Sequence, residues 1–210
     1  RTLYGFGWQR TADRKLLIGD DGYPMMDPNM KALANVDPDW TMGAGTSLRW
    51  KNLNLYVLFD IKAGGHMWNG TRGAMDHFGT SEGTANRDEW YLFEGVHADG
   101  TANTTQVKLD QAWRAGDGSG FTGPSEDYIE DANWVRLRTV TISYSFTSLL
   151  KKTFIKGLDI YITGTNLWLS TPYSGIDPET NLLGASNQQG IDYFNMPGTR
   201  SYTVGLSLSL

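Results

Sequence analysis

The last ten residues of the chain alternate strictly between apolar and small polar side chains. In "SYTVGLSLSL" (201–210), Tyr202, Val204 and each second residue up to Leu210 are apolar, and the positions between them hold only Ser, Thr and Gly. Successive side chains of a strand point to opposite faces, so the pattern predicts a strand with one oily and one hydroxyl-rich face. The oily face suits either a second sheet in a soluble sandwich or the lipid around a membrane barrel, which about 9–11 tilted residues can cross.

The same two-residue period predicts two long hairpins. The first has its strands at 41–50 and 53–63, and the two residues between them suit a tight turn because Asn tolerates the left-handed conformation that such turns need. The second hairpin spans 134–168, with the clearest alternation in 139–146 and 158–168. The link between these two strands is short and basic.

Helical periodicity is nearly absent from the sequence. Short helical turns are expected only in 109–118 and 146–154, and residues 2–10 could form one further strand. The pattern therefore predicts an all-β chain with five or six antiparallel strands.

The connections between the expected strands differ sharply in length. The turn at 51–52 and the link near 147–157 are short, whereas 11–40, 64–133 and 169–200 are long and rich in Gly, Asp, Asn, Thr and Pro. In an up-and-down meander, alternate connections lie at the same end of the sheet. All short connections thus fall at one end, which is the pattern of outer-membrane barrels with short periplasmic turns and long external loops.

Aromatic and polar residues fit the same barrel hypothesis. The polar faces of the expected strands carry Asn54, Asp60, Lys62 and Asp159 among many Ser and Thr residues, as a lumen requires. Membrane barrels place aromatic girdles near strand ends. The aromatic residues expected to form such girdles are Trp40, Trp50, Trp134, Trp168 and Tyr202.

Two arginines conflict with this assignment. Arg136 and Arg138 share a phase with the apolar residues Val140 and Ile142. A lipid-facing Arg costs about 2–4 kcal/mol at mid-membrane and close to nothing at the interface. Either the two side chains lie above the hydrocarbon, or a bulge shifts the phase of the strand.

Composition narrows the classes of function. The chain of 210 residues has a net charge of −5 and no long basic run, which argues against a nucleic-acid partner. It has no Cys, and its three His residues form no close ligand pair, so neither a disulfide framework nor a metal centre is expected. No apolar run reaches the length of a transmembrane helix. The start lacks a signal peptide and an initiator Met, so Arg1 is expected to be an internal position of a longer protein.

Several stretches resemble one family. They are "YIEDANWVRLRTVTISYSF" (128–146), "LDIYITGTNLW" (158–168) followed by "YSGIDPETN" (173–181), "GIDYFNMPGTRSYTVGLSLSL" (190–210), and the hairpin and loop at 35–81. In order and spacing they resemble the late barrel strands of the SusC/RagA-like TonB-dependent outer-membrane transporters. The resemblance covers roughly residues 20–210, although no single motif in it is highly specific. Barrels of this family commonly end in Phe, whereas this chain ends in Leu210.

The resemblance implies an antiparallel up-and-down transmembrane β-barrel. Residues 1–210 would supply the last five or six strands of a 22-strand barrel, without the signal sequence and the plug domain that whole members carry. The implied function is TonB-dependent import of a glycan or a peptide across the outer membrane. A SusD-like surface lipoprotein would act as the lid, and the TonB complex would act through the missing N-terminal part. No enzymatic activity and no cofactor are implied.

Two alternatives remain at this point. One is a soluble carbohydrate-binding β-sandwich that uses tryptophans in its loops, and the other is a structural outer-membrane barrel without transport. The candidate residues for contact with a ligand or a partner all lie in the long loops: Trp68, His77, Trp90, Tyr91, Trp113, Tyr173 and Tyr193. These aromatic side chains could equally pack the loops against themselves.

Carboxylates in the loops invite two further hypotheses, and neither fits well. "GDDGYP" (19–24) and "GDGSG" (116–120) lack the spacing of an EF-hand, and Asp-Gly pairs are ordinary turn formers. Asp177 and Glu179 form a carboxylate pair, but no candidate nucleophile lies near them in the sequence. No metal site and no catalytic residue are therefore predicted.

Overall fold

The chain folds into two compact units, each assembled from three separate stretches of sequence. The computed structural model describes residues 1–147, 154–184, 186 and 188–209. The loop unit comprises 1–37, 65–131 and 180–195, and the sheet unit comprises 38–64, 132–179 and 196–210. Among the described residues, no helix is long and apolar enough to cross a membrane.

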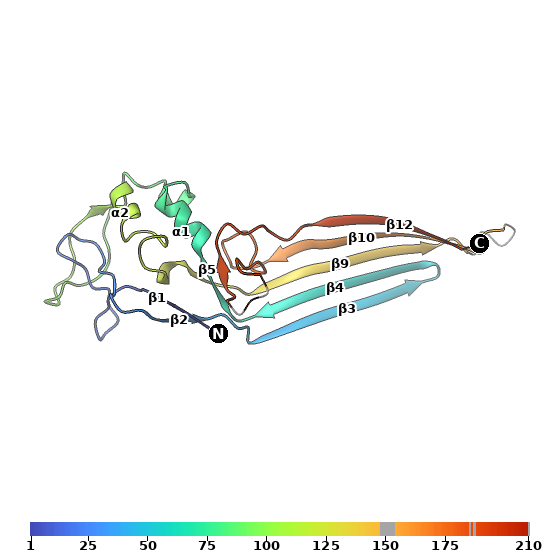
Figure 1. Ribbon diagram of the computed structural model, residues 1–210, viewed down its shortest axis with the longest axis horizontal. Coiled ribbons are helices and arrows are strands. Elements are labelled where there is room, and N and C mark those ends of the chain that lie inside the picture. The colour runs from blue at the N-terminus through green and yellow to red at the C-terminus, as the bar shows by residue number, and fades with distance from the viewer. Residues whose placement is uncertain (148–153, 185, 187, 210) are drawn as a thin grey trace. The chain divides into compact units, whose positions relative to one another are not determined.

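The sheet unit is a single antiparallel sheet of five long strands in the order β12-β10-β9-β4-β3 (Figure 1). Both predicted hairpins are confirmed. In the first, Lys51, and not Asn52 as expected, adopts the left-handed conformation, with φ of 54°, at the turn. The strands are β3 (Trp40–Trp50), β4 (Leu53–Ala63), β9 (Trp134–Ser145), β10 (Gly157–Ser170) and β12 (Ser201–Ser209).

One face of this sheet is apolar and carries exposed side chains. A row of cross-strand partners runs over all five strands through Leu48, Leu55, Ile142, Ile162 and Val204. Ile162 on the central part of the row is 53% exposed and Val204 at the edge is 71% exposed. A second sheet would bury such a row in a sandwich. The exposure of this row does not match the soluble sandwich hypothesis.

The opposite face is polar, as predicted. Its matching row runs through Ser47, Tyr56, Thr141, Thr163 and Thr203, and the hydroxyls of Thr141 and Thr163 lie 2.9 Å apart. The two faces keep their character over this part of the sheet because the strands stay in register along both rows.

Four of the five aromatic residues expected in girdles lie on the apolar face. Trp40 and Trp168 lie towards the end where β4 stops and β9 starts, Trp50 lies near the other end, and Tyr202 lies near the start of β12 at the level of Val57 in the middle of β4. Trp134 was assigned wrongly to this group. It pairs with Lys62, which places it on the polar face, and only 8% of it is exposed.

A bulge in β9 resolves the conflict raised by the two arginines. Leu58 pairs with Thr139 and Phe59 with Leu137, so Arg138 is an extra residue without a partner in β4. The extra residue shifts the phase, and Arg136 falls opposite Asp60 on the polar face. The assignment of both arginines to the face of Val140 was therefore wrong, and the predicted alternative of a bulge is confirmed.

The neighbouring strand has its own irregularity at the same level. The pairing of β10 with β9 jumps between Thr165 and Trp168, and Asn166 between them has a φ of 52°. The guanidinium of Arg138 donates to the side-chain oxygen of Asn166 at 2.9 Å. The two irregularities thus face each other across a side-chain hydrogen bond.

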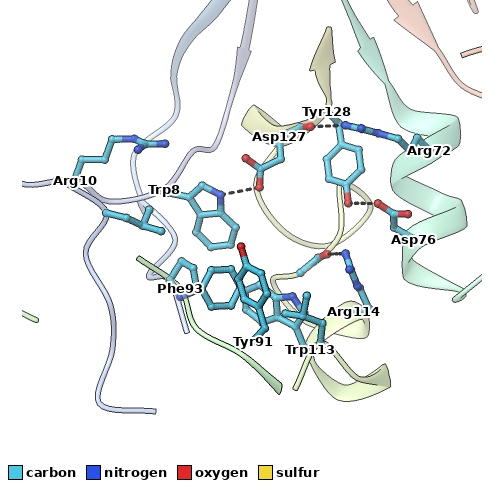
Figure 2. A pocket seen from close by; sticks show the side chains of 14 residues that line it. Trp8, Arg10, Arg72, Asp76, Tyr91, Phe93, Trp113, Arg114, Asp127 and Tyr128 are labelled. Atoms are coloured by element: carbon cyan, nitrogen blue, oxygen red, sulfur yellow. Dashed lines mark hydrogen bonds between the residues drawn. The ribbon is translucent and has the colours of Figure 1, made fainter. Parts of the chain in front are cut away.

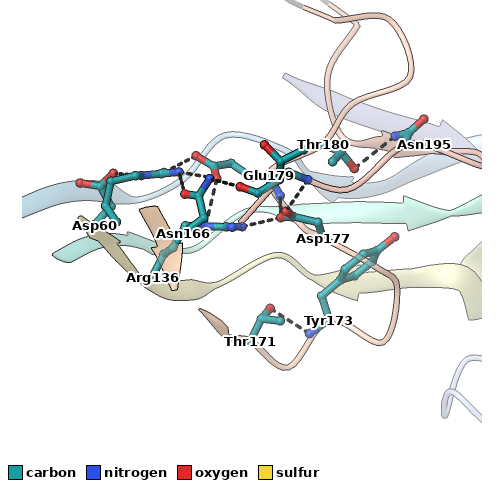
Figure 3. Close-up of polar contacts among 12 residues, drawn as sticks. Asp60, Arg136, Asn166, Thr171, Tyr173, Asp177, Glu179, Thr180 and Asn195 are labelled. Atoms are coloured by element: carbon teal, nitrogen blue, oxygen red, sulfur yellow. Dashed lines mark hydrogen bonds and ion pairs between the residues drawn. The ribbon is translucent and has the colours of Figure 1, made fainter. Parts of the chain in front are cut away.

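Three carboxylates neutralise the two arginines on the polar face (Figure 3). Arg138 Nε donates to Asp60 at 2.6 Å, and its Nη2 pairs with Glu179. Arg136 pairs with Asp177 at 2.6 Å and with Glu179 at 3.1 Å. The side chains of Arg136 and Asp177 are each only 4% exposed. We call these five residues the charge cluster.

The charge cluster holds the segment 175–179 against the sheet. Asp177 accepts hydrogen bonds from the backbone N–H groups of Glu179 and Gly198, at 3.0 and 3.3 Å, in addition to its bond from Arg136. Both guanidinium groups also lie 5.6 Å from the ring centre of Trp134. The two carboxylates that stood out in the sequence as a pair therefore bind arginines of the sheet.

The loop unit contains much more regular structure than the sequence predicted. The strand expected at 2–10 forms only over Thr2–Gly5. The helix expected at 109–118 is confirmed as α2. Of the helical turn expected at 146–154, residues 148–153 lie outside the described residues. The elements are β1 (Thr2–Gly5), β2 (Lys31–Asn35), β5 (His66–Asn69), α1 (Gly70–His77), η1 (Glu82–Thr84), β6 (Trp90–Tyr91), β7 (Val107–Lys108), α2 (Gln111–Ala115), η2 (Glu126–Tyr128), β8 (Ile129–Asp131) and β11 (Ile191–Asp192).

Helix α1 was missed because caps and close packing form it, not an apolar stripe. The side chain of Asn69 accepts a hydrogen bond from the backbone N–H of Arg72 at 2.9 Å and caps the first turn. Gly73 lets the helix approach the backbone of Gly120, where an added Cβ would lie 3.0 Å away. Gly is a poor helix former, so local propensity gave no sign of this element.

We expect the charge cluster to stabilise the sheet unit mainly through its buried pair. Replacing Asp177 by Ala leaves the guanidinium of Arg136 buried without its closest carboxylate, which should cost about 3–5 kcal/mol of unfolding free energy. Denaturant titration of the purified whole protein measures this. Asp159→Ala removes an exposed carboxylate from the same face and should change stability by less than about 0.5 kcal/mol. Equal losses from both variants would contradict the proposed role of the cluster.

Candidate functional site

The loop unit holds an open cavity of about 460 Å³ (Figure 2). This volume lies within the range of roughly 300–1,000 Å³ that is usual for small-molecule sites. Stretches far apart in the sequence supply its wall, including Trp8 near the start, Arg72 and Asp76 on α1, and Asp127 and Tyr128 on η2.

Aromatic rings form one side of the cavity. Trp113 on α2 stacks on Trp8, with ring centres 5.9 Å apart, and on Tyr23, with ring centres 4.6 Å apart. A Cβ on Gly118 would lie 2.2 Å from the indole nitrogen of Trp113, so only glycine allows this packing. Tyr91 leans edge-on against Phe93 at 4.8 Å and is 46% exposed. The stack orders the loops, and Tyr91 lies where the cavity reaches solvent.

Two of the five charged residues that line the cavity have partners of opposite sign. Arg10 pairs with Glu126 at 2.6 Å, and Arg72 pairs with Glu130 at 3.3 Å. Burial alone would raise the pKa of Glu126, but hydrogen bonds from Arg10 and Lys31 lower it below its ordinary value. These pairs leave little net charge at this part of the wall.

Two acidic side chains accept hydrogen bonds from aromatic residues. Asp127 accepts from the indole N–H of Trp8 at 2.8 Å, and burial raises the pKa of Asp127 above its ordinary value. Tyr128 donates its hydroxyl to Asp76 at 2.8 Å. Burial and the neighbouring Asp76 both raise the pKa of Tyr128, so its hydroxyl stays protonated and serves as a donor.

Arg114 differs from the other cations of the wall. Its guanidinium donates to the backbone carbonyls of Gly118 at 3.1 Å and Gly83 at 3.3 Å. Within the part of the chain that the structure describes, no carboxylate lies within ion-pair distance of Arg114, and its buried Nε has no hydrogen-bond partner. Asp110 caps the short helix α2, accepting from the N–H of Trp113 at 3.1 Å, and so fixes the base of Arg114.

Of the seven candidate residues, the cavity brings together only Tyr91 and Trp113. Trp90, next to Tyr91, does not line it; this side chain is 65% exposed and has Lys108 over its ring at 5.3 Å. His77 lies at the end of α1 against Phe78 and Phe121, at 4.9 and 5.1 Å. The candidate set was therefore spread over several environments.

The other three candidates pack against neighbouring parts of the protein. Trp68 stacks on Tyr193 with ring centres 6.4 Å apart and an angle of 9° between the planes. Tyr173 belongs to the sheet unit, is 4% exposed, and covers Gly175, where an added Cβ would lie 2.4 Å from the ring. For these residues the structure matches the alternative in which the aromatic side chains order the loops.

Sequence inspection missed most of the cavity wall. Trp8, Arg72, Arg114, Asp127 and Tyr128 come from separated stretches that share no motif, so nothing in their spacing could have grouped them. The Asp-Gly pair at 21–22 forms a turn, with the N–H of Gly22 bonded to the carbonyl of Gly19 at 3.0 Å. In residues 1–147, 154–184, 186 and 188–209, no group of three or more His, Asp or Glu side chains is arranged to hold a metal ion.

Comparison with known proteins gives consistent results. No family model matches the chain. It is 31% identical over 212 residues to TonB-dependent receptor P3 of Formosa agariphila, a match that covers 98% of this chain and 18% of the relative. It is also 33% identical over 86 residues to TonB-dependent receptor SusC of Bacteroides thetaiotaomicron, covering 40% of this chain and 8% of that protein.

Solved structures agree on the fold. The RagAB peptide importer in its open-open state superposes with a TM-score of 0.67 at 20% identity, covering all of this chain and 22% of the matched chain. The closed-closed state gives a TM-score of 0.65. The antiparallel sheet of the sheet unit thus corresponds to a segment of a β-barrel, and the chain spans about a fifth of the length of these proteins. The chain is part of a SusC/RagA-like TonB-dependent receptor.

Proposed function

We propose that the protein containing this chain is a TonB-dependent nutrient importer of the outer membrane. The observation that carries the proposal is the apolar face of the five-stranded sheet, on which Ile142, Ile162 and Val204 are 49%, 53% and 71% exposed. Lipid is the environment that such a face requires when no second layer covers it. The names of the similar proteins, a TonB-dependent receptor and a peptide importer, support the direction and the energy source of transport.

The two edges of the sheet support a closed barrel in the whole protein. Strands β3 and β12 each have a neighbour on one side only among the described residues. In lipid, each unpaired backbone N–H or C=O group costs several kcal/mol, so further strands must pair with both edges. We propose that residues 1–210 are the C-terminal part of a barrel of 22 strands whose plug domain contacts the TonB complex.

A SusD-like surface lipoprotein is the proposed partner, and an oligosaccharide or a peptide is the proposed cargo. The loop at 64–133 presents exposed aromatic side chains, with Phe78 and Phe121 exposed by 64% and 48% and clustered with each other and with His77. Aromatic residues are enriched in the buried centres of protein interfaces. The alternative of a structural barrel without transport predicts no dependence on TonB.

Uptake is the direct test of the importer function. Cells that carry the complete gene should accumulate labelled oligosaccharide or peptide, and deletion of the TonB gene should abolish this uptake while the receptor remains in the outer membrane. Uptake that persists at the same rate without TonB would reject the proposal. Absence of any uptake, with the receptor correctly inserted, would favour the structural barrel.

The orientation of the sheet can be tested by cysteine labelling. Single cysteines at Asp159 and Ser207, which pair on the polar face, should react with a membrane-impermeant maleimide in intact cells. Cysteines at their neighbours Ile160 and Leu206, which pair on the apolar face, should be protected by lipid. This chain contributes no cysteine of its own to the background. The reverse labelling pattern would show that the faces were assigned the wrong way round.

The partner surface can be tested with a double variant. Phe78→Ser with Phe121→Ser should reduce co-purification of the lipoprotein at least about tenfold, because loss of a central aromatic contact typically costs 2 kcal/mol or more. Met30→Ser removes another exposed apolar side chain of the loop unit, outside 64–133, and should leave the yield unchanged. Wild-type yield from the double variant would move the contact to the loops at 11–40 or 169–200.

A further inference from the structure

We propose that the end of the sheet unit with the short connections binds the headgroup of an anionic phospholipid in the periplasmic leaflet, through Arg49, Lys51 and Lys156. All three residues belong to the sheet unit. The proposal rests on the membrane barrel of the proposed function, because outer-membrane barrels place their short turns on the periplasmic side. The periplasmic leaflet consists of glycerophospholipids, and some of these carry a net negative charge.

The apolar face of the sheet ends at this level in a row with two exposed aromatic residues. The cross-strand partners of the row are Trp50, Leu53, Tyr144, Ile160 and Leu206. Trp50 is 70% exposed and Tyr144 is 38% exposed. Trp and Tyr side chains prefer the headgroup level of a membrane. Residues just beyond this row therefore lie at the depth of the lipid phosphates.

Two cations lie at the turn between β3 and β4, directly beyond the row (Figure 1). The ammonium group of Lys51 lies 5.2 Å from the centre of the Trp50 ring. Arg49 Nε lies 3.5 Å from the backbone carbonyl oxygen of Lys51, so its guanidinium lies beside the same turn. Lys51 thus carries its charge next to the aromatic residue that marks the membrane interface.

A third cation lies at the same end of the sheet, just before β10. The backbone N–H of Lys156 donates to the carbonyl of Ser209 at 2.9 Å, and the side chain of Lys156 is exposed. Lys156 precedes Leu158 and Ile160 at the two-residue period of the strand, which gives it the phase of the apolar face. The long apolar stem of a Lys can lie along lipid chains while its ammonium group reaches the headgroups.

No carboxylate of this part of the chain balances the three cations. The stretches 40–59 and 132–158 contain no Asp and no Glu. Among the residues that the structure describes, no carboxylate lies within ion-pair distance of Arg49, Lys51 or Lys156. The arginines of the charge cluster, in contrast, are paired with three carboxylates. The positive charge at the turns is therefore available to an anion from outside the chain.

A lipid headgroup fits this end of the sheet better than a protein does. The turn between β3 and β4 consists of Lys51 and Asn52 alone. A specific protein interface usually buries about 1,200–2,000 Å², which a two-residue turn cannot supply. A lipid phosphate needs only a few cations at the membrane surface, and each Lys or Arg there attracts anionic lipids.

The experiment measures which lipid lies beside the turn in the whole receptor. Leu53→Cys, on the apolar face opposite Trp50, is labelled with a fluorescent dye, and the receptor is reconstituted in phosphatidylcholine bilayers. Spin-labelled phosphatidylglycerol or spin-labelled phosphatidylcholine is added as the quencher. We expect the anionic lipid to reach half-maximal quenching at a mole fraction at least about tenfold lower, because each surface cation contributes about fivefold. Salt at about 1 M should remove most of this preference.

Matched variants identify the residues responsible. Lys51→Asn removes the charge and still suits the left-handed turn, where φ is 54°. Lys51→Asn and Lys156→Gln should each lower the preference for phosphatidylglycerol about fivefold, and Lys51→Arg should retain it. Arg200→Gln removes an exposed cation of the sheet unit next to Ser201, at the opposite end of β12 from Ser209, and should leave the preference unchanged.

Three results would overturn the proposal. They are equal quenching by the two lipids in the wild-type receptor, an unchanged preference in both lysine variants, and a loss in Arg200→Gln as large as that in Lys51→Asn. Failure of the proposed function looks different. Without a membrane barrel the dye would be quenched by neither lipid, and a barrel that does not import would show the lipid preference without TonB-dependent uptake.

Discussion

The structure of the sheet unit depends on one constraint, which is that a strand has only two faces. Five strands must each keep their apolar residues on the same face, and a single misplaced residue would move every following side chain to the wrong side. Strand β9 carries charged residues on the wrong phase at its start, and the extra residue Arg138 corrects the phase before the apolar run begins. The bulge therefore lets one strand be charged at one end and oily along the rest.

The bulge creates the need for the charge cluster. Once Arg136 and Arg138 lie on the polar face, their charges require partners, and Asp60 on β4 supplies only one carboxylate. Asp177 and Glu179 supply the other two from the segment that follows β10. The correction of the strand phase thus fixes the position of a loop segment, and a feature of secondary structure determines a tertiary contact.

The sequence predicted the sheet well because period two is a local signal. Both hairpins, the two faces and the conflict at Arg136 and Arg138 could be read from neighbouring residues alone. The loop unit could not be predicted in this way. Helix α1 depends on the close approach of Gly73 to Gly120, and the cavity joins Trp8 to Trp113 and Tyr128. Such contacts between distant residues leave no periodic trace in the sequence.

The misassignment of Trp134 shows how a bulge can override the face that the local sequence pattern predicts for a residue. Its place at the start of a strand suggested an interfacial girdle, and local pattern alone supports that interpretation. The phase shift at Arg138 places it on the polar face instead, where both guanidinium groups of the cluster lie over its ring. In this position the ring partly replaces the water that the two cations lose on burial, through attraction to its electron-rich face. An aromatic residue beside a bulge of charged residues therefore packs against the charged side chains. The same residue beside an unbroken apolar run would lie at the membrane interface.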